Sequence, residues 1–227
     1  MAIITLKTLH LRQYARIFAW LFLVYLATRL GDTWMLSSGN VALFWPSNAI
    51  LLAALILLDP RSRIVCFTLS IPVSLAAELS SGYSLVSALL FTTANCVEVA
   101  IAFVVVVKMT NPPHGFISLR NLQVMFFAII IATMIGGVID VAAYWDSSYL
   151  MSWRKWALGD LMVFWVLTPF ILTSHEWPKW FQTADPGARL EFLTLFGVMT
   201  LILLERSGSE IQICCSSPLL KSYVLAS

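Results

Sequence analysis

Four acidic residues lie within otherwise apolar stretches of the chain: Glu78, Glu98, Asp140 and Asp160. A charged side chain at the centre of a bilayer costs at least ~2.5–3.5 kcal/mol, so such groups normally face protein or water. Intramembrane carboxylates serve in proton transfer, ion passage or ligand binding. These four residues are therefore the first places to look for chemistry.

Glu98 has the most informative neighbours. Asn95 precedes it by three residues, so the two side chains share one face of a helix. Ser84, Ser87 and Phe91 precede them on roughly the same stripe. We therefore expect this face to point into the protein, with Glu98 the deepest of the acids.

Asp160 lies one turn into a helix that we predict to begin near residue 156. Asn48 follows Trp45 and Pro46 at the start of another predicted helix, near the same non-cytoplasmic side. We expect Asp160 and Asn48 to lie close to that side, and Glu98 to lie deeper.

Asp140 follows two small residues, Gly136 and Gly137. Such a pair lets another helix approach closely. Asp140 is expected near the outer end of its own helix.

Each of these polar groups also has a purely structural interpretation, in which they hydrogen-bond to one another and fix the helix packing. Both interpretations stay open for Asn48, Asn95 and Asp140. For Glu98 and Asp160 a functional pocket is favoured, because a carboxylate is a costly packing device.

Glu78 is interpreted differently, because it precedes Ser80, Ser81 and Gly82. Here we favour a structural role at the membrane interface, where water solvates the carboxylate.

Catalytic and metal-binding patterns are missing from the sequence. It contains no nucleophile elbow, phosphate-binding loop or dinucleotide fingerprint, and no C-x-x-C pair. The three histidines, His10, His114 and His175, lie in or near predicted loops without a second ligand at metal spacing. The four cysteines are interpreted as small apolar residues; they are Cys66, Cys96, Cys214 and Cys215. We predict no enzyme activity, no metal and no cofactor.

The composition requires an apolar solvent. Of 227 residues, 59% are hydrophobic and 11% are charged, against about 45–50% and about 25% in soluble domains. The net charge of +2 does not suggest nucleic acid as a partner. The chain is therefore predicted to be an integral membrane protein.

About 20 mostly apolar residues are needed to cross the hydrocarbon core as a helix. Seven stretches are candidates, of which the third and seventh are short: 14–30, 41–58, 64–79, 84–107, 122–145, 156–174 and 190–204. The predicted fold is an all-α polytopic transmembrane helix bundle of six to eight spans over residues 14–204. Residues 1–13 form an N-terminal arm, and residues 205–227 form a tail.

The second stretch begins with Trp45 and Pro46. Proline suits the first turn of a helix, where its missing N–H costs nothing. Trp45 is expected at the membrane interface, as tryptophans often are.

Orientation follows from the distribution of Lys and Arg. Positive residues occur in the N-terminal arm and in segments 59–63, 108–121 and 175–189, which share one side under a seven-span count. The opposite side has Arg29, Arg154 and Lys155. The N-terminus is therefore predicted to be cytoplasmic.

Three motifs in order resemble the first type of membrane-associated sensor (MASE) domain, a multi-helix bacterial input module. They are residues 43–50 (LFWPSNAI), residues 95–98 (NCVE) and residues 156–160 (WALGD), the last followed by Pro169. The resemblance covers about residues 14–204.

This resemblance implies a sensory role in the bacterial inner membrane, ahead of a cytoplasmic output domain such as a GGDEF diguanylate cyclase or a histidine kinase. It carries over Trp45, Asn48, Asn95, Glu98 and Asp160 as ligand or signalling positions. Implied partners are the bilayer, an unidentified ligand, and a second copy or other membrane signalling proteins.

The family usually has about eight spans and returns to the cytoplasm, whereas here the apolar pattern stops near Leu204 and no output domain follows. We expect a shortened gene product with a frameshifted tail at 205–227.

Two other functions remain as alternatives to a sensor. Intramembrane acids also suit a small transporter or transport subunit, although no inverted repeat is visible. A membrane scaffold without a ligand is the third hypothesis.

The purified chain is expected to require detergent or lipid to stay monomeric, because an apolar exterior aggregates in water. Size-exclusion chromatography after detergent removal checks this. A stable monomer in plain buffer would contradict the membrane assignment.

Overall fold

The structure is a computed structural model that describes residues 11–38, 45–110, 119–142, 149–174 and 177–194. Within these ranges every regular element is a helix, so the all-α class is confirmed. Two compact units are distinguished: Met1–Met35 with Asn40–Ser174, and Leu36–Gly39 with His175–Ser227.

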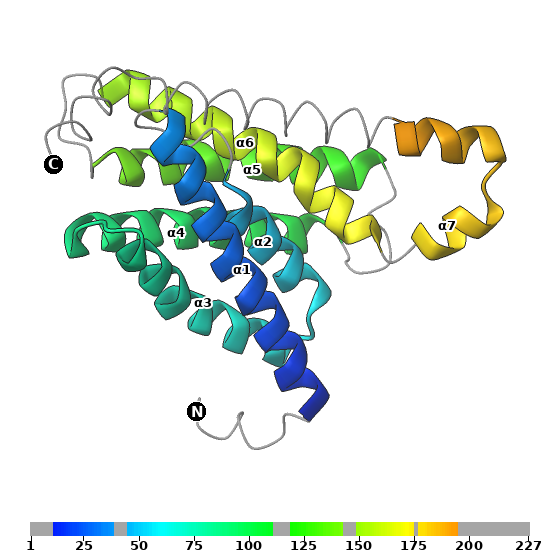
Figure 1. The fold of residues 1–227 in the computed structure, drawn as a ribbon, viewed down its shortest axis with the longest axis horizontal. Coiled ribbons are helices and arrows are strands. Elements are labelled where there is room, and N and C mark those ends of the chain that lie inside the picture. Colours follow the sequence, from blue (N-terminus) through cyan, green and yellow to red (C-terminus); the bar gives the residue numbers. More distant parts are fainter. Residues whose placement is uncertain (1–10, 39–44, 111–118, 143–148, 175–176, 195–227) are drawn as a thin grey trace, which may run out of the picture. The chain divides into compact units, whose positions relative to one another are not determined.

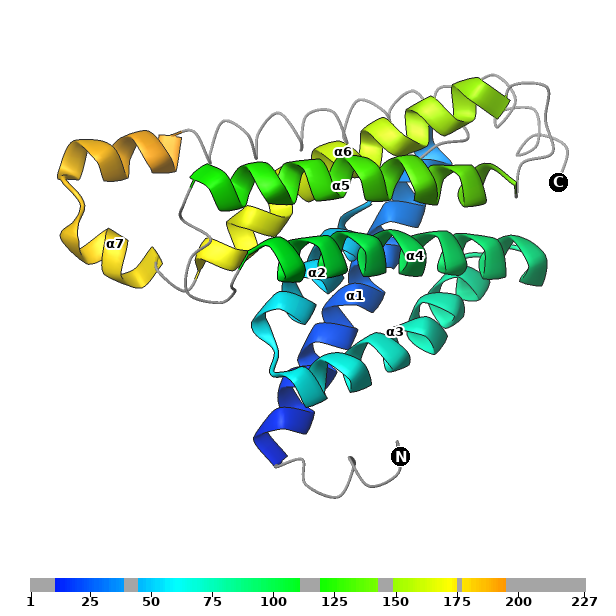
Figure 2. The same cartoon turned by 180° about the vertical axis from the view of Figure 1, so that it is seen from behind.

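The first unit holds the helices that concern function (Figures 1 and 2). They are α1 (Leu11–Ser38), α2 (Pro46–Leu57), α3 (Pro60–Ser80), α4 (Leu85–Met109), α5 (Leu119–Val141) and α6 (Tyr149–Thr173). The second unit contains α7 (Trp177–Thr183) and a helical segment over 186–194, whose Phe192 packs edge-on against Trp177 and Phe181.

Four helices, α3 to α6, are long and apolar enough to cross a membrane. They correspond to the predicted stretches 64–79, 84–107, 122–145 and 156–174. The chain is thus a membrane domain of several apolar helices, but the count of seven spans is not confirmed.

The other three predicted spans differ in their outcome. The stretch 41–58 contains α2, which has 12 residues and at about 18 Å is too short for a hydrocarbon core of about 30 Å. The stretch 14–30 lies in α1, where charged residues near both ends leave an uncharged run of only 17–28. Most of 190–204 lies outside the described residues.

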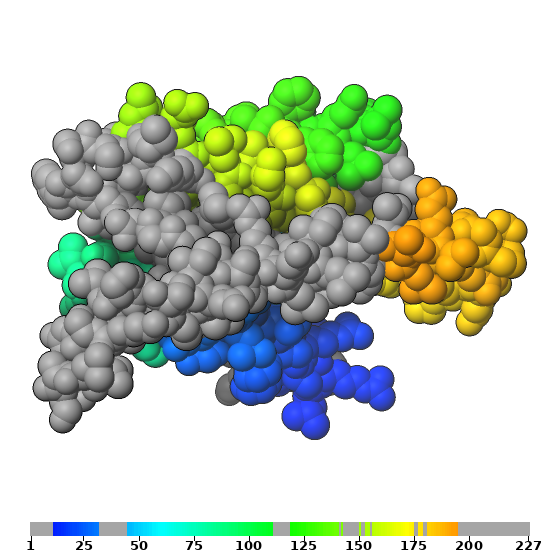
Figure 3. Space-filling model, turned by 45° about the horizontal axis from the view of Figure 1, so that its top comes forward, coloured from blue at the N-terminus to red at the C-terminus, as the bar shows by residue number. Residues whose placement is uncertain are grey.

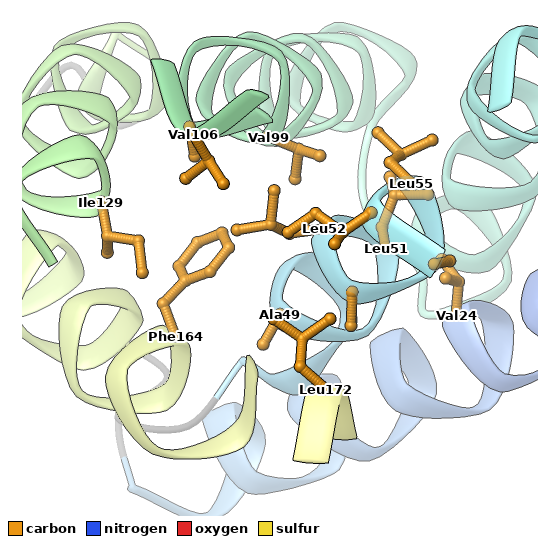
Figure 4. Packing of buried hydrophobic residues seen from close by; sticks show 14 of the residues in the cluster. Val24, Ala49, Leu51, Leu52, Leu55, Val99, Val106, Ile129, Phe164 and Leu172 are labelled. Carbon is orange, nitrogen blue, oxygen red and sulfur yellow. The ribbon is translucent and has the colours of Figure 1, made fainter. Parts of the chain in front are cut away.

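Helix α2 is apolar on every side and forms the centre of the core. A helix that is hydrophobic all round is buried, and ten of its residues are buried, Pro46 and Leu52 among them. Figure 4 shows its Leu52 directed toward Val99 of α4 and Phe164 of α6, and its Leu51 on the side of Val24 of α1. The short helix is therefore enclosed by protein rather than lipid.

Local sequence signals set the helix starts. Pro46 occupies the first turn of α2, as predicted, and Pro60 does the same in α3. Asp59 caps α3, and its Oδ1 accepts hydrogen bonds from the N–H groups of Arg61 and Ser62, each at 3.2 Å. The Ser62 side chain and these backbone N–H groups lower the pKa of Asp59, which lies outside the spans.

Small residues allow close helix contacts, as the Gly136–Gly137 pair predicted. A Cβ at Gly136 would lie 3.1 Å from Cβ of Glu98, and a Cβ at Gly137 would lie 3.0 Å from the Trp153 ring. Helix α5 therefore approaches both α4 and α6 closely. In the same way Gly31 of α1 receives the ring of Trp45, whose Cε3 lies 2.5 Å from the position of an added Cβ.

Large apolar side chains cover the outside of these helices. Phe18 and Phe22 of α1 stack on each other and are more than half exposed, and Phe127 of α5 and Met162 of α6 are similarly exposed. Figure 3 shows side chains of α1, α5 and α6 at the surface. Such surfaces suit contact with lipid.

Gly31→Ala is expected to destabilise the fold by about 1–3 kcal/mol, the usual cost of overpacking, because the new methyl group collides with the Trp45 ring. In a Trp45→Leu background the same change should cost close to nothing. Thermal unfolding in detergent, followed by circular dichroism, measures this double-mutant cycle. An equal cost in both backgrounds would show that the ring is not the obstacle.

Candidate functional site

Asn48 lies in the first turn of α2, inside the bundle, because Pro46 starts this buried helix only two residues earlier. Its Nδ2 lies within hydrogen-bonding distance of three acceptors: Asn95 Oδ1 at 2.8 Å, Glu98 Oε2 at 2.9 Å and Asp160 Oδ2 at 3.2 Å. All four side chains are buried. We call these four residues the amide–carboxylate cluster.

Helix α4 supplies Asn95 and Glu98. The prediction that they share an inward face is confirmed, because both bind the same nitrogen of Asn48. Phe91, one turn earlier on this stripe, is also buried and packs edge-on against Tyr83. At the start of the helix, by contrast, Ser84 is exposed and Ser87 half-buried, and their hydroxyl groups bond to each other.

Helix α6 supplies Asp160, which lies one turn into the apolar span Trp156–Thr173, as predicted. The helix itself begins earlier, at Tyr149, so Asp160 lies about three turns into it. Asn48 and Asp160 therefore lie at the same depth as Glu98, since Asn48 binds both carboxylates. Helices α4 and α6 have 25 residues each, and the cluster lies near the middle of both.

Asp140 lies in the last turn of α5 and is buried. It is close enough to Asp160 for the two carboxylates to repel each other, but no hydrogen bond joins it to the cluster in the described part of the chain. Its Oδ2 is buried without a hydrogen-bond partner. The structure thus places Asp140 beside the cluster rather than in it.

Trp45 is enclosed by protein: the residue is 9% exposed, and its ring packs against Gly31. Its place at the membrane interface stays a prediction. The indole Nε1 is buried without a hydrogen-bond partner among the described residues. No hydrogen bond in the described part of the chain joins Trp45 to the cluster, and its ring packs against Gly31.

Glu78 is likewise not solvated by water as expected, since its side chain is fully buried. Helix α3 buries it on the same face as Ser74 and Ala77. Three residues later, Ser81 Oγ accepts a hydrogen bond from the Arg29 guanidinium of α1. Glu78 thus lies three residues before the residue that joins α3 to α1.

Two further residues attach α6 near the cluster and were not singled out from the sequence. Thr168, two turns after Asp160, donates from Oγ1 to the carbonyl oxygen of Ala49 at 3.5 Å. Trp165 Nε1 donates to the carbonyl oxygen of Phe126 on α5 at 3.4 Å. The spacing of eight between Asp160 and Thr168, which puts both on one helix face, was the available signal.

The arrangement is rich in acceptors. Glu98 Oε1 and Asp140 Oδ2 are buried without partners, in addition to the three acceptors that surround Asn48. No three ligating side chains in the described ranges are arranged to hold a metal ion. The cluster can therefore bind a proton or a hydrogen-bond donor.

Asn48→Leu should destabilise the bundle by about 1–3 kcal/mol, because buried acceptors lose their common donor. Asn95→Leu removes only one of the three bonds and should cost less. Thermal unfolding of both variants in detergent compares them. A cost for Asn95→Leu equal to or above that for Asn48→Leu would contradict the central place of the Asn48 amide.

Comparisons with known proteins give one match. The MASE1 family model covers residues 16–219, nearly the whole chain, and so extends beyond the predicted bundle boundary at 204. No curated protein and no solved structure matches the chain. The chain therefore belongs to the MASE1 family of membrane-associated sensor domains, as its motifs indicated, and is a membrane sensory input domain.

Proposed function

We propose that this input domain senses its stimulus at the amide–carboxylate cluster and passes the response to a cytoplasmic cyclic-di-GMP or histidine-kinase output domain. The observation that carries the proposal is the single Asn48 amide that hydrogen-bonds to both α4 and α6. The chain acts in the bacterial inner membrane with its N-terminus in the cytoplasm.

The cluster suits a two-state response because it connects elements that are far apart in sequence. Asn48 and Asp160 are 112 residues apart, and their bond couples the central helix to α6. A ligand shifts such an equilibrium only through different affinities for the two packings. Any stimulus that changes one acceptor changes how α2, α4 and α6 fit together.

The proposed orientation is supported by the helix ends. Arg61 and Arg63 open α3, Lys108 closes α4, and Arg120 opens α5. Consecutive antiparallel spans bring these ends to one side of the membrane, and clusters of Lys and Arg mark the cytoplasmic side. Arg154, near the start of α6, falls on the other side.

The proposal is tested by fusing the full chain to a diguanylate cyclase catalytic domain and measuring cyclic-di-GMP in cells. Asn48→Leu and Glu98→Gln should each change the level by about 5-fold or more, the lower end of typical coupling between sites. The change follows because the variants alter the balance of packings at the cluster.

Thr93→Val is the matched control on the same helix. Thr93 is exposed, and its hydroxyl bonds only to the Leu89 carbonyl of α4, so cyclic-di-GMP should match that of the unaltered fusion. Membrane protein levels must be equal in all strains. Unchanged cyclic-di-GMP in both cluster variants would refute the proposal.

Transport remains the second candidate, favoured by the buried carboxylates in the described spans, which are Glu78, Glu98, Asp140 and Asp160. Proton flux into liposomes containing the chain tests it. Flux that Glu98→Gln abolishes would replace the sensory proposal with transport.

A further inference from the structure

The geometry of the amide–carboxylate cluster points to one bound proton, shared between Glu98 and Asp160, as the ligand of this site. The inference rests on the proposed sensory function for its biological meaning, but the proton itself follows from the arrangement of donors and acceptors. The stimulus of the sensor is then a change in proton activity.

The Asn48 amide has fewer hydrogens than the acceptors around it. An amide NH₂ group has two hydrogens, yet Asn48 Nδ2 faces three acceptors. The two nearer oxygens, on Asn95 and Glu98, account for both hydrogens. Asp160 Oδ2, at 3.2 Å, then lacks a donor of its own. A proton on one carboxyl supplies it, as an O–H that donates to the other carboxylate.

No positive charge balances the carboxylates of the cluster in the described ranges. The charged group that the neighbouring helices bring toward the cluster is acidic, since α2 contributes no charged residue and α5 contributes Asp140. Nowhere in the described ranges does Lys, Arg or His form a pair with Glu98, Asp140 or Asp160.

The cations of the same helices lie elsewhere. Arg154 of α6 is exposed, Lys108 ends α4, Arg120 opens α5, and Arg29 of α1 donates to Ser81. Like charges in a low-dielectric interior repel strongly, and two carboxylates that share a site favour keeping one proton.

Helix α5 packs tightly against Glu98 and leaves little space beside it. Gly136 of α5 lies so close that an added Cβ would be 3.1 Å from Cβ of Glu98 and 3.3 Å from the Trp156 ring. The described side chains also offer no set of three ligands for a metal ion. A proton needs no volume and no ligand shell, so it fits where a larger cation would have to move α5.

Loss of the proton would leave Glu98 of α4 and Asp160 of α6 both ionised around a single amide. Their repulsion favours a packing in which α4 and α6 lie further apart. The folded state with the proton is therefore the stable one at low pH, and its stability falls as pH rises through the point at which the proton leaves.

Infrared difference spectroscopy of the full chain in lipid nanodiscs tests the inference directly. The unaltered protein should show the C=O stretch of a protonated carboxylic acid at neutral pH, sensitive to deuterium exchange and lost as pH rises. The band should be missing in Glu98→Gln, because the Gln amide supplies the donor, and altered in Asp160→Asn. Glu78→Gln, a buried acid outside the cluster, should retain it.

Unfolding provides a second readout. One linked proton lowers the folding equilibrium constant tenfold per pH unit between the pH at which the unfolded chain releases it and the higher pH at which the folded chain does. Glu98→Gln should remove this dependence, whereas Asp185→Asn, at an exposed position, should keep it. If Glu98→Gln does not fold, the titration of the unaltered protein together with Asp160→Asn decides.

The inference is overturned if no acid band is present at neutral pH, or if the band persists unchanged in both Glu98→Gln and Asp160→Asn. Its failure is separable from that of the proposed function. An acid band that titrates, without any cyclic-di-GMP response in the fusion, supports the proton site and contradicts the proposed sensory function. A cyclic-di-GMP response without the band supports the sensory function and contradicts the proton site.

Discussion

The fold of this chain depends on satisfying polar groups that lipid cannot solvate. Carboxylates of α4 and α6 are buried among apolar helices, where an unpaired polar group costs several kcal/mol. The Asn48 amide meets that requirement with bonds to Asn95, Glu98 and Asp160. Because one donor serves acceptors on separate helices, none of these helices can move without affecting the others.

Helix α2 makes this possible because it is short and enclosed. Its side chains, such as Leu52 and Ala53, are fully buried and fill the space between the longer helices. A helix in contact with lipid would have placed Asn48 at the edge of the bundle. Enclosure by α1, α4 and α6 instead directs the amide to the interior, and Gly136 lets α5 close the remaining side.

This arrangement explains how a membrane sensor domain can carry information. Cores held by packing alone have one preferred arrangement. In a polar cluster with more acceptors than donors, each bound proton or ligand changes which hydrogen bonds form. Asp140 lies buried beside Asp160 with one oxygen unpaired, and it adds a further acceptor near these hydrogen bonds. Membership in a family of membrane-associated sensor domains agrees with such a role.

The sequence alone determined the membrane class, the helical fold, the shared face of Asn95 and Glu98, and the family, because hydropathy, helical spacing and motifs are local properties. Only the tertiary structure decided that Asn48 and Asp160, 112 residues apart, meet Glu98 at one depth. That meeting depends on α2 being too short to span and on α6 starting at Tyr149. The tertiary structure also decided that Trp45 and Glu78 are buried, since burial depends on which helix packs beside a residue, and no local pattern specifies that neighbour.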